Sequence, residues 1–155
     1  MLLYAASSYY HSRQTLEQKQ TFKIIDHACI YLLIAGSYTP FTLGPLREFG
    51  GWNLMAIEWT IAIIGITLKI IAVDRLQMVS LLAYLGMGWL VVFSYETLME
   101  QMPATAVTWL IIGGLSYTIG TIFYIWDKLP YNHGIWHLFV LFGSASHYIC
   151  VLHMI

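Results

Sequence analysis

Apolar runs of about 20 residues, separated by short polar clusters, constrain this chain more than any other feature of its sequence. A helix of that length rises about 30 Å, which matches the hydrocarbon core of a bilayer. Only 10% of the 155 residues are charged and the mean hydropathy is +0.68, whereas about 25% charged residues is usual in soluble domains. The pattern predicts an all-α fold, a polytopic bundle of membrane helices forming a single integral membrane domain over residues 1–155.

Six spans are expected in that domain. The first is partial, because residues 1–11 would cover only about 16 Å as a helix before a polar run begins. It indicates that the chain is truncated or a fragment. The other spans are expected at about 24–43, 52–73, 76–95, 104–126 and 135–155. Between them we expect a Gly- and Pro-containing turn at 44–51, a tight connection at Asp74 and Arg75, a loop at 96–103 and a loop at 127–130.

The basic residues are distributed unevenly between alternate loops. One set of loops carries six of the seven basic residues, namely Arg13, Lys19, Lys23, Lys69, Arg75 and Lys128. The opposite loops carry only Arg47, together with Glu48, Glu96 and Glu100. The positive-inside rule assigns the basic side to the cytoplasm and the C-terminus to the outside of the cell membrane. No basic face suggests a nucleic-acid partner, and Cys29 and Cys150 are expected to be buried free thiols.

Two histidines, His133 and His137, stand four residues apart where the last apolar run begins. On a helix this spacing puts both imidazoles on one face, about 40° and ~6 Å apart. Neutral imidazole is the commonest nitrogen ligand for zinc, so the pair is suited to two corners of a metal site.

The expected topology brings further polar residues to the same membrane depth. His11 ends the first segment at the cytoplasmic face, and Asp26 opens the next span there. Three histidines with one open position for water form a common catalytic zinc arrangement. Asp26 would accept a proton from that water or orient a ligand imidazole, and Ser7, four residues before His11, would hydrogen-bond the water or an oxyanion.

Structural explanations exist for the same residues. Histidines at membrane ends are often interfacial, an aspartate favours a helix N-terminus electrostatically, and a lone serine commonly bonds to the backbone of its own helix. Among the other polar residues, His27 should point about 100° away from Asp26. His147 is expected to be a hydrogen-bonded interhelical histidine and His153 an interfacial one. Glu58 is expected to reach the headgroups and Lys69 to snorkel to the inner surface.

Three ordered segments resemble the hemolysin III family, a bacterial branch of the progestin and adiponectin receptor proteins that is related more distantly to alkaline ceramidases. The segments are Ser7 with His11, the stretch from Asp26 through Ser37-Tyr38-Thr39-Pro40-Phe41, and His133-Gly134-Ile135-Trp136-His137-Leu138-Phe139-Val140-Leu141. The resemblance implies a seven-helix bundle with zinc near the cytoplasmic face. It implies ligands at His11, His133 and His137, with Asp26 and Ser7 as partners. The chain departs from the family pattern by lacking the first helix and the front of the second.

Three functions are compatible with these residues. The first is a membrane-embedded zinc hydrolase acting on a lipid amide or ester that enters from the bilayer. The second is a cytolysin or channel-like protein, which the family name implies, although the spans show no continuous polar stripe. The third is a receptor-like or membrane-homeostasis protein in which zinc is structural. In each case the expected partners are membrane lipids.

Overall fold

The computed structural model describes residues 16–72, 76–126 and 128–154, with side chains described from Thr21 onward. Within these ranges the elements are α2 (Leu16–Leu43), η1 (Arg47–Gly51), α3 (Trp52–Ala72), α4 (Gln77–Trp89), η2 (Leu90–Ser94), α5 (Tyr95–Gln101), α6 (Ala104–Ile125) and α7 (Asn132–Leu152). The described ranges contain no strand, so the predicted all-α class is confirmed. The predicted partial span at 1–11 and the connection at Asp74 and Arg75 lie outside them.

Within the described residues, five helical segments are long and apolar enough to cross a membrane, so the chain is a multi-pass helical membrane protein. They are Thr21–Leu43, Arg47–Ala72, Gln77–Gln101, Ala104–Ile125 and Asn132–Leu152. Each overlaps a predicted span. The last helix begins at Asn132 rather than near residue 135, which places both histidines of the pair inside it.

The loop predicted at 96–103 was wrong over most of its length. Residues Tyr95–Gln101 form α5, because this stretch contains neither Gly nor Pro and is rich in residues with good helix propensity. The helix stops only where Met102 turns extended, at φ −120° and ψ 148°. That conformation is favoured for a residue that precedes a proline, here Pro103. Pro103 then caps α6, as expected for a proline at a helix start.

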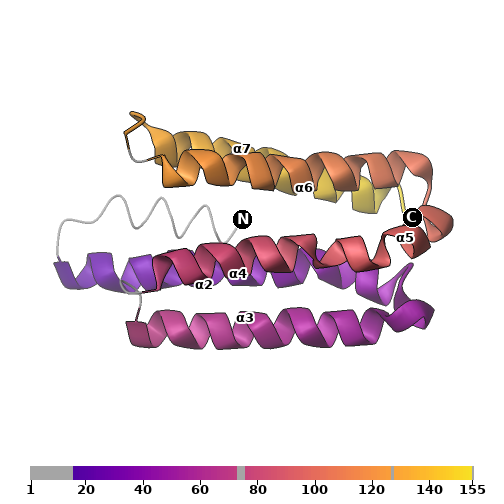
Figure 1. Ribbon diagram of the computed structural model, residues 1–155, viewed down its shortest axis with the longest axis horizontal. Helices are drawn as coiled ribbons and strands as arrows, with labels where there is room; N and C mark the ends of the chain where they lie inside the picture. Colours follow the sequence, from indigo (N-terminus) through magenta and orange to yellow (C-terminus); the bar gives the residue numbers. More distant parts are fainter. Residues whose placement is uncertain (1–15, 73–75, 127, 155) are drawn as a thin grey trace. The chain divides into compact units, whose positions relative to one another are not determined.

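The chain divides into two compact units, one ending at Leu90 and one beginning at Val91. In the first unit α2, α3 and α4 run side by side (Figure 1). Its core consists of Tyr31 and Ala35 from α2, Ala62 from α3 and Met87 from α4, all at most 2% exposed. Gly65 of α3 lies against the Tyr31 ring. The prediction of a single domain stays a prediction.

The turn predicted at 44–51 is confirmed, and two glycines explain its shape. Gly50 has φ 85°, a left-handed conformation that favours glycine. A Cβ on Gly51 would lie only 2.6 Å from the Leu46 carbonyl oxygen, so no larger residue fits there. The Gly51 amide donates to that same oxygen at 2.8 Å. The turn thereby fixes how α3 folds back along α2.

In the second unit α6 and α7 lie against each other over most of their length (Figure 1). Glycines on both helices allow this approach. His147 and Phe139 of α7 pack against Gly113 and Gly120 of α6, and the ring of Tyr117 of α6 packs against Gly143 of α7. Gly113, Gly120 and Gly143 therefore allow the close approach of the two helices, whereas Gly114 has nothing within 4 Å of its Cβ position.

Two interhelical hydrogen bonds accompany the glycine contacts. The Ser116 hydroxyl donates to the Phe139 carbonyl oxygen at 2.8 Å, and the hydroxyls of Tyr117 and Ser144 lie 2.8 Å apart. Because hydrocarbon offers no alternative partner, such bonds hold the register of two membrane helices. They fix the position of α7 along α6.

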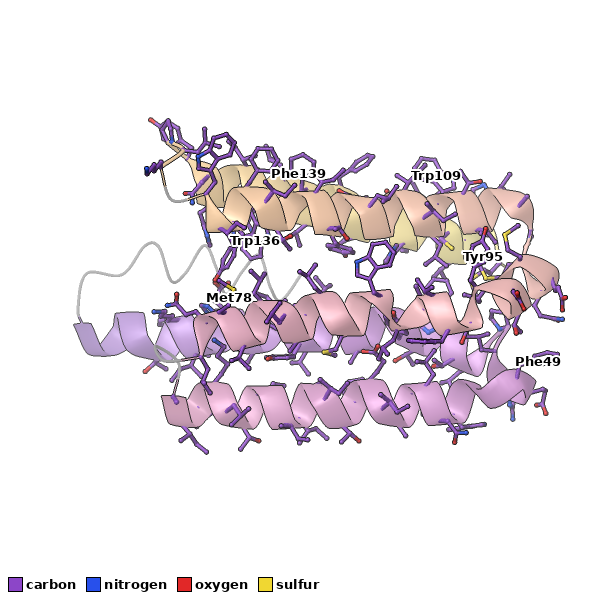
Figure 2. All side chains as sticks on the ribbon, in the orientation of Figure 1. Phe49, Met78, Tyr95, Trp109, Trp136 and Phe139 are labelled. Carbon is purple, nitrogen blue, oxygen red and sulfur yellow. The ribbon has the colours of Figure 1, made fainter. Side chains whose placement is uncertain are left out.

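Apolar side chains cover the outer faces of the helices (Figure 2). On α3, for example, Ile63, Ile70 and Ile71 are 62%, 63% and 75% exposed. Contiguous exposure of this kind is unfavourable in water and suits a lipid environment. Lys69, in contrast, does not snorkel to the surface as predicted. It is completely buried and its Nζ donates to the Leu76 carbonyl oxygen at 3.5 Å, because the start of the next helical segment folds over it.

The α6–α7 contact predicts a difference between two adjacent glycines. Gly113→Ala should lower the thermal unfolding temperature of the purified protein, because the new methyl group meets the His147 ring; overpacking of this kind costs about 1–3 kcal/mol. Gly114→Ala is the matched control, and it should leave stability unchanged or raise it by up to about 1 kcal/mol through helix propensity. Equal unfolding temperatures for the two variants would contradict this account of the interface.

Candidate metal site

His133 and His137 lie in the first two turns of α7, and their imidazoles meet. Their Nε2 atoms are 3.1 Å apart, and their ring centroids are 4.6 Å apart with the planes at 86°. Both side chains are half-buried. The predicted sharing of one helix face is confirmed, and both rings present the same nitrogen to one point.

This geometry fits a bound zinc ion. Two nitrogen ligands at about 2.0–2.1 Å from a tetrahedral zinc lie roughly 3.3 Å from each other. The observed 3.1 Å between the Nε2 atoms of His133 and His137 is close to that separation. The pair can therefore hold two corners of a tetrahedral site with little movement of either ring.

Aromatic residues hold the pair in place. The Trp136 ring lies 4.5 Å from the His137 ring and 5.1 Å from the His133 ring, centroid to centroid. Trp136 is itself buried, and it packs at 5.0 Å against Tyr124 near the end of α6. Figure 2 labels Trp136 and Phe139, which stacks at 5.1 Å on Phe123 of α6. The two aromatic contacts anchor the first turns of α7 to α6.

Asp26 belongs to α2 in the first unit. Its side chain is only 3% exposed, so it is buried rather than solvated at a helix end. His27, its neighbour, turns its Nδ1 to the Lys23 carbonyl oxygen at 2.7 Å, as a donor to its own helix. This bond uses one ring nitrogen of His27.

Two of the predicted site residues, Ser7 and His11, lie outside the described residues. Within residues 16–72, 76–126 and 128–154 there is no group of three or more His, Cys, Asp or Glu side chains arranged to hold a metal. The structure thus brings together His133 and His137. The convergence of these two with His11, Asp26 and Ser7 stays a prediction.

The remaining histidines have structural settings. His147 is lodged between α6 and α7, where its ring lies against Gly113 and 5.4 Å from the Tyr117 ring. The expected interhelical role of His147 is therefore confirmed. His153 is exposed just beyond α7, and its Nδ1 lies 2.9 Å from the Ile149 carbonyl oxygen.

Two features were missed by sequence reasoning. The first is Trp136, which contacts both histidines; its position three residues after His133 and one before His137 was the available signal. The second is Glu58, expected at the headgroups and in fact 0% exposed. Its position seven residues from both Gly51 and Gly65 was the available signal, since residues seven apart share a helix face.

The fold and this site define a multi-pass helical membrane protein with a histidine pair at the start of its last helix. Comparison with known proteins gives the same class: the family model described as Haemolysin-III related matches residues 1–148. The chain belongs to the haemolysin-III related family. Comparison with solved structures gives no match.

Individual relatives agree with the family match. The chain is 46% identical over 152 residues to the hemolysin-3 homolog of Bacillus subtilis, covering 98% of this chain and 71% of the relative. It is 49% identical over 151 residues to hemolysin-3 of Bacillus cereus, covering 97% and 69%. The human monocyte to macrophage differentiation factor is 34% identical over 136 residues, covering 84% and 54%. The last match supports the wider relationship to progestin and adiponectin receptor proteins.

The contact between Trp136 and both imidazoles predicts an optical signal for metal binding. Titration of purified protein with Co²⁺ should quench tryptophan fluorescence, because a paramagnetic ion at the two Nε2 atoms would lie beside the Trp136 ring. The decrease in fluorescence should be absent in His137→Ala and much smaller in Trp136→Phe. His153→Ala, at the other end of α7, is the control that keeps it. Undiminished quenching in His137→Ala would place the ion elsewhere.

Proposed function

We propose that this member of the haemolysin-III related family binds zinc through His133, His137 and His11. The observation that carries the proposal is the 3.1 Å separation of the two Nε2 atoms, which suits two ligands of one tetrahedral ion. The predicted topology supports His11 as the third ligand, because it puts that residue at the same membrane face as the start of α7. The site would then face the cytoplasm.

We further propose that the site hydrolyses a lipid amide or ester. Zinc bound there would supply Lewis acidity and an activated water. Asp26 is the proposed proton acceptor, because carboxylates are common general bases and its side chain is only 3% exposed. Ser7 is suited to hydrogen-bond a developing oxyanion.

The surroundings of the pair favour a lipid over a soluble substrate. His133 and His137 are half-buried, while Leu138 and Leu141 on the following turns are 66% and 51% exposed. An acyl chain can lie along such an apolar helix surface while its carbonyl group reaches the histidines. The exposed aliphatic surface of α7 is therefore the expected approach for the substrate.

Lipid turnover by purified protein in mixed lipid vesicles tests this proposal. Release of fatty acid from amide- or ester-linked lipids should fall in His137→Ala and in Asp26→Asn by roughly 10²-fold or more, the usual contribution of a proton-transferring group. Ile63→Ala, on the exposed face of α3 and away from the proposed substrate approach on α7, is the control for folding. Zinc binding that persists without turnover of any lipid would sink the hydrolase proposal and favour a receptor-like or homeostatic role with structural zinc.

A second candidate function, cytolysis, is favoured by the names of the two bacterial relatives, hemolysin-3 and its homolog. Serine and threonine hydroxyl groups argue against a pore through the described helices, because ten of them donate to carbonyl oxygens of the preceding turn of their own helix. Leakage of a trapped dye from liposomes distinguishes the two functions. A cytolysin would release dye equally well in the wild type and in His137→Ala.

A further inference from the structure

Glu58 is a carboxyl group buried inside a membrane-spanning segment. It lies on α3, seven residues into the helix that begins at Trp52, and its side chain is 0% exposed. Both of its carboxyl oxygens are buried and have no hydrogen-bond partner among the described residues. Burial of an ionised carboxylate without a partner is strongly unfavourable, so the chemical state of this group needs an explanation.

Contacts made by neighbouring glycines place Glu58 against α2. Gly51 lies against the Leu46 carbonyl group just after α2, and Gly65 lies against the Tyr31 ring. Glu58 is midway between these two glycines and on the same helix face, since residues seven apart are about 20° from alignment. Because α2 and α3 are antiparallel, Glu58 is level with the stretch of α2 around Tyr38 (Figure 1).

The hydroxyl groups in that stretch of α2 do not donate hydrogen bonds to Glu58. Each donates its proton to a backbone carbonyl oxygen: Ser37 to Ile34, Tyr38 to Met87 and Gly88, Thr39 to Ala35, and Thr42 to Thr39. The donor–acceptor distances are 2.8 to 3.1 Å. The backbone N–H groups of both helices are used within the helices themselves. A carboxylate at Glu58 would therefore have no described donor to stabilise it.

The charged groups of the surrounding elements are also remote from Glu58 or committed elsewhere. Besides Glu58, the described titratable side chains of these elements are few. They are Lys23, Asp26, His27, Cys29, Tyr31 and Tyr38 on α2, Arg47 and Glu48 on η1, Lys69 on α3 and Tyr84 on α4. Lys69 is about 16 Å further along α3. Arg47 is exposed and pairs with Glu48 at 3.8 Å, and the Tyr84 hydroxyl donates to the His27 carbonyl oxygen at 3.0 Å. None of these elements brings a buried cation to the level of Glu58 in the described residues.

We propose that Glu58 is a proton-binding site, with the proton itself as ligand. In the described conformation the Glu58 side chain is a neutral carboxylic acid, because an ionised carboxylate would need a hydrogen-bond donor or a cation beside it to be buried. Uptake adds one proton to a carboxylate oxygen and removes one negative charge from the interior of the first unit, and release reverses both changes. The residues that carry this inference belong to the first unit, whereas the histidine pair belongs to the second unit.

Infrared spectroscopy of the purified protein in lipid at neutral pH tests this proposal. The wild type should show a carboxylic acid C=O band that is absent in Glu58→Gln, a change that preserves shape and removes only the acid. Glu48→Gln, at a carboxylate whose side chain is 84% exposed, is the matched control and should keep the band. The band should shift in D₂O, because a binding site must exchange its proton with water.

A second measurement keeps the proposal falsifiable if Glu58→Gln does not fold. Wild-type protein labelled with ¹³C at the glutamate carboxyl carbon should show the isotope-shifted acid band at neutral pH, since the acid must then be a glutamate. Absence of the isotope-shifted acid band in the labelled wild type, or its survival in labelled, folded Glu58→Gln, would overturn the proposal. A glutamate acid band that never shifts in D₂O would overturn it as well, because such a proton is trapped rather than bound reversibly.

Discussion

The close contact of α6 with α7 is the interaction on which the candidate site depends. Hydrocarbon gives two apolar helices no hydrophobic reason to associate, so their contact relies on packing and on hydrogen bonds. Gly113, Gly120 and Gly143 remove the side chains that would keep the axes apart, and the Ser116 bond to the Phe139 carbonyl oxygen fixes the register. Register matters because it sets where α7 begins relative to the end of α6.

At the start of α7, Trp136 connects the helix packing to the histidine pair. The residue packs against Tyr124 of α6 on one side and contacts both His133 and His137 on the other. A metal ligand must be held to within a fraction of an ångström of the geometry that the ion requires. Residues fixed by packing on a helix hold that position better than residues on a loop. The histidine pair is thus preorganised by the same contact that assembles the second unit.

Much of this architecture follows from the sequence. The apolar runs predicted all five spanning segments, and the i, i+4 spacing predicted the meeting of His133 and His137, because both depend on local helical geometry. The loop expected at 96–103 was wrong because the helix propensity of this stretch is high enough to form α5. The surface positions expected for Glu58 and Lys69 were wrong because burial depends on which neighbours cover a side chain. Composition carries no information about those neighbours, and for Glu58 only the seven-residue spacing from Gly51 and Gly65 pointed to a buried face. The fold class was therefore predictable, whereas the burial of individual charged residues was not.

The central claim is that the histidine pair is part of a zinc site, and the metal content of purified protein tests it most directly. Elemental analysis of wild-type protein, prepared without chelator and normalised to chain concentration, should give about one zinc ion per chain, the number expected for a single mononuclear site. His137→Ala should lose that ion, while His153→Ala should retain it, because His153 lies beyond the far end of α7. Zinc retained at the wild-type level in His137→Ala, or absent from the wild type, would contradict the account.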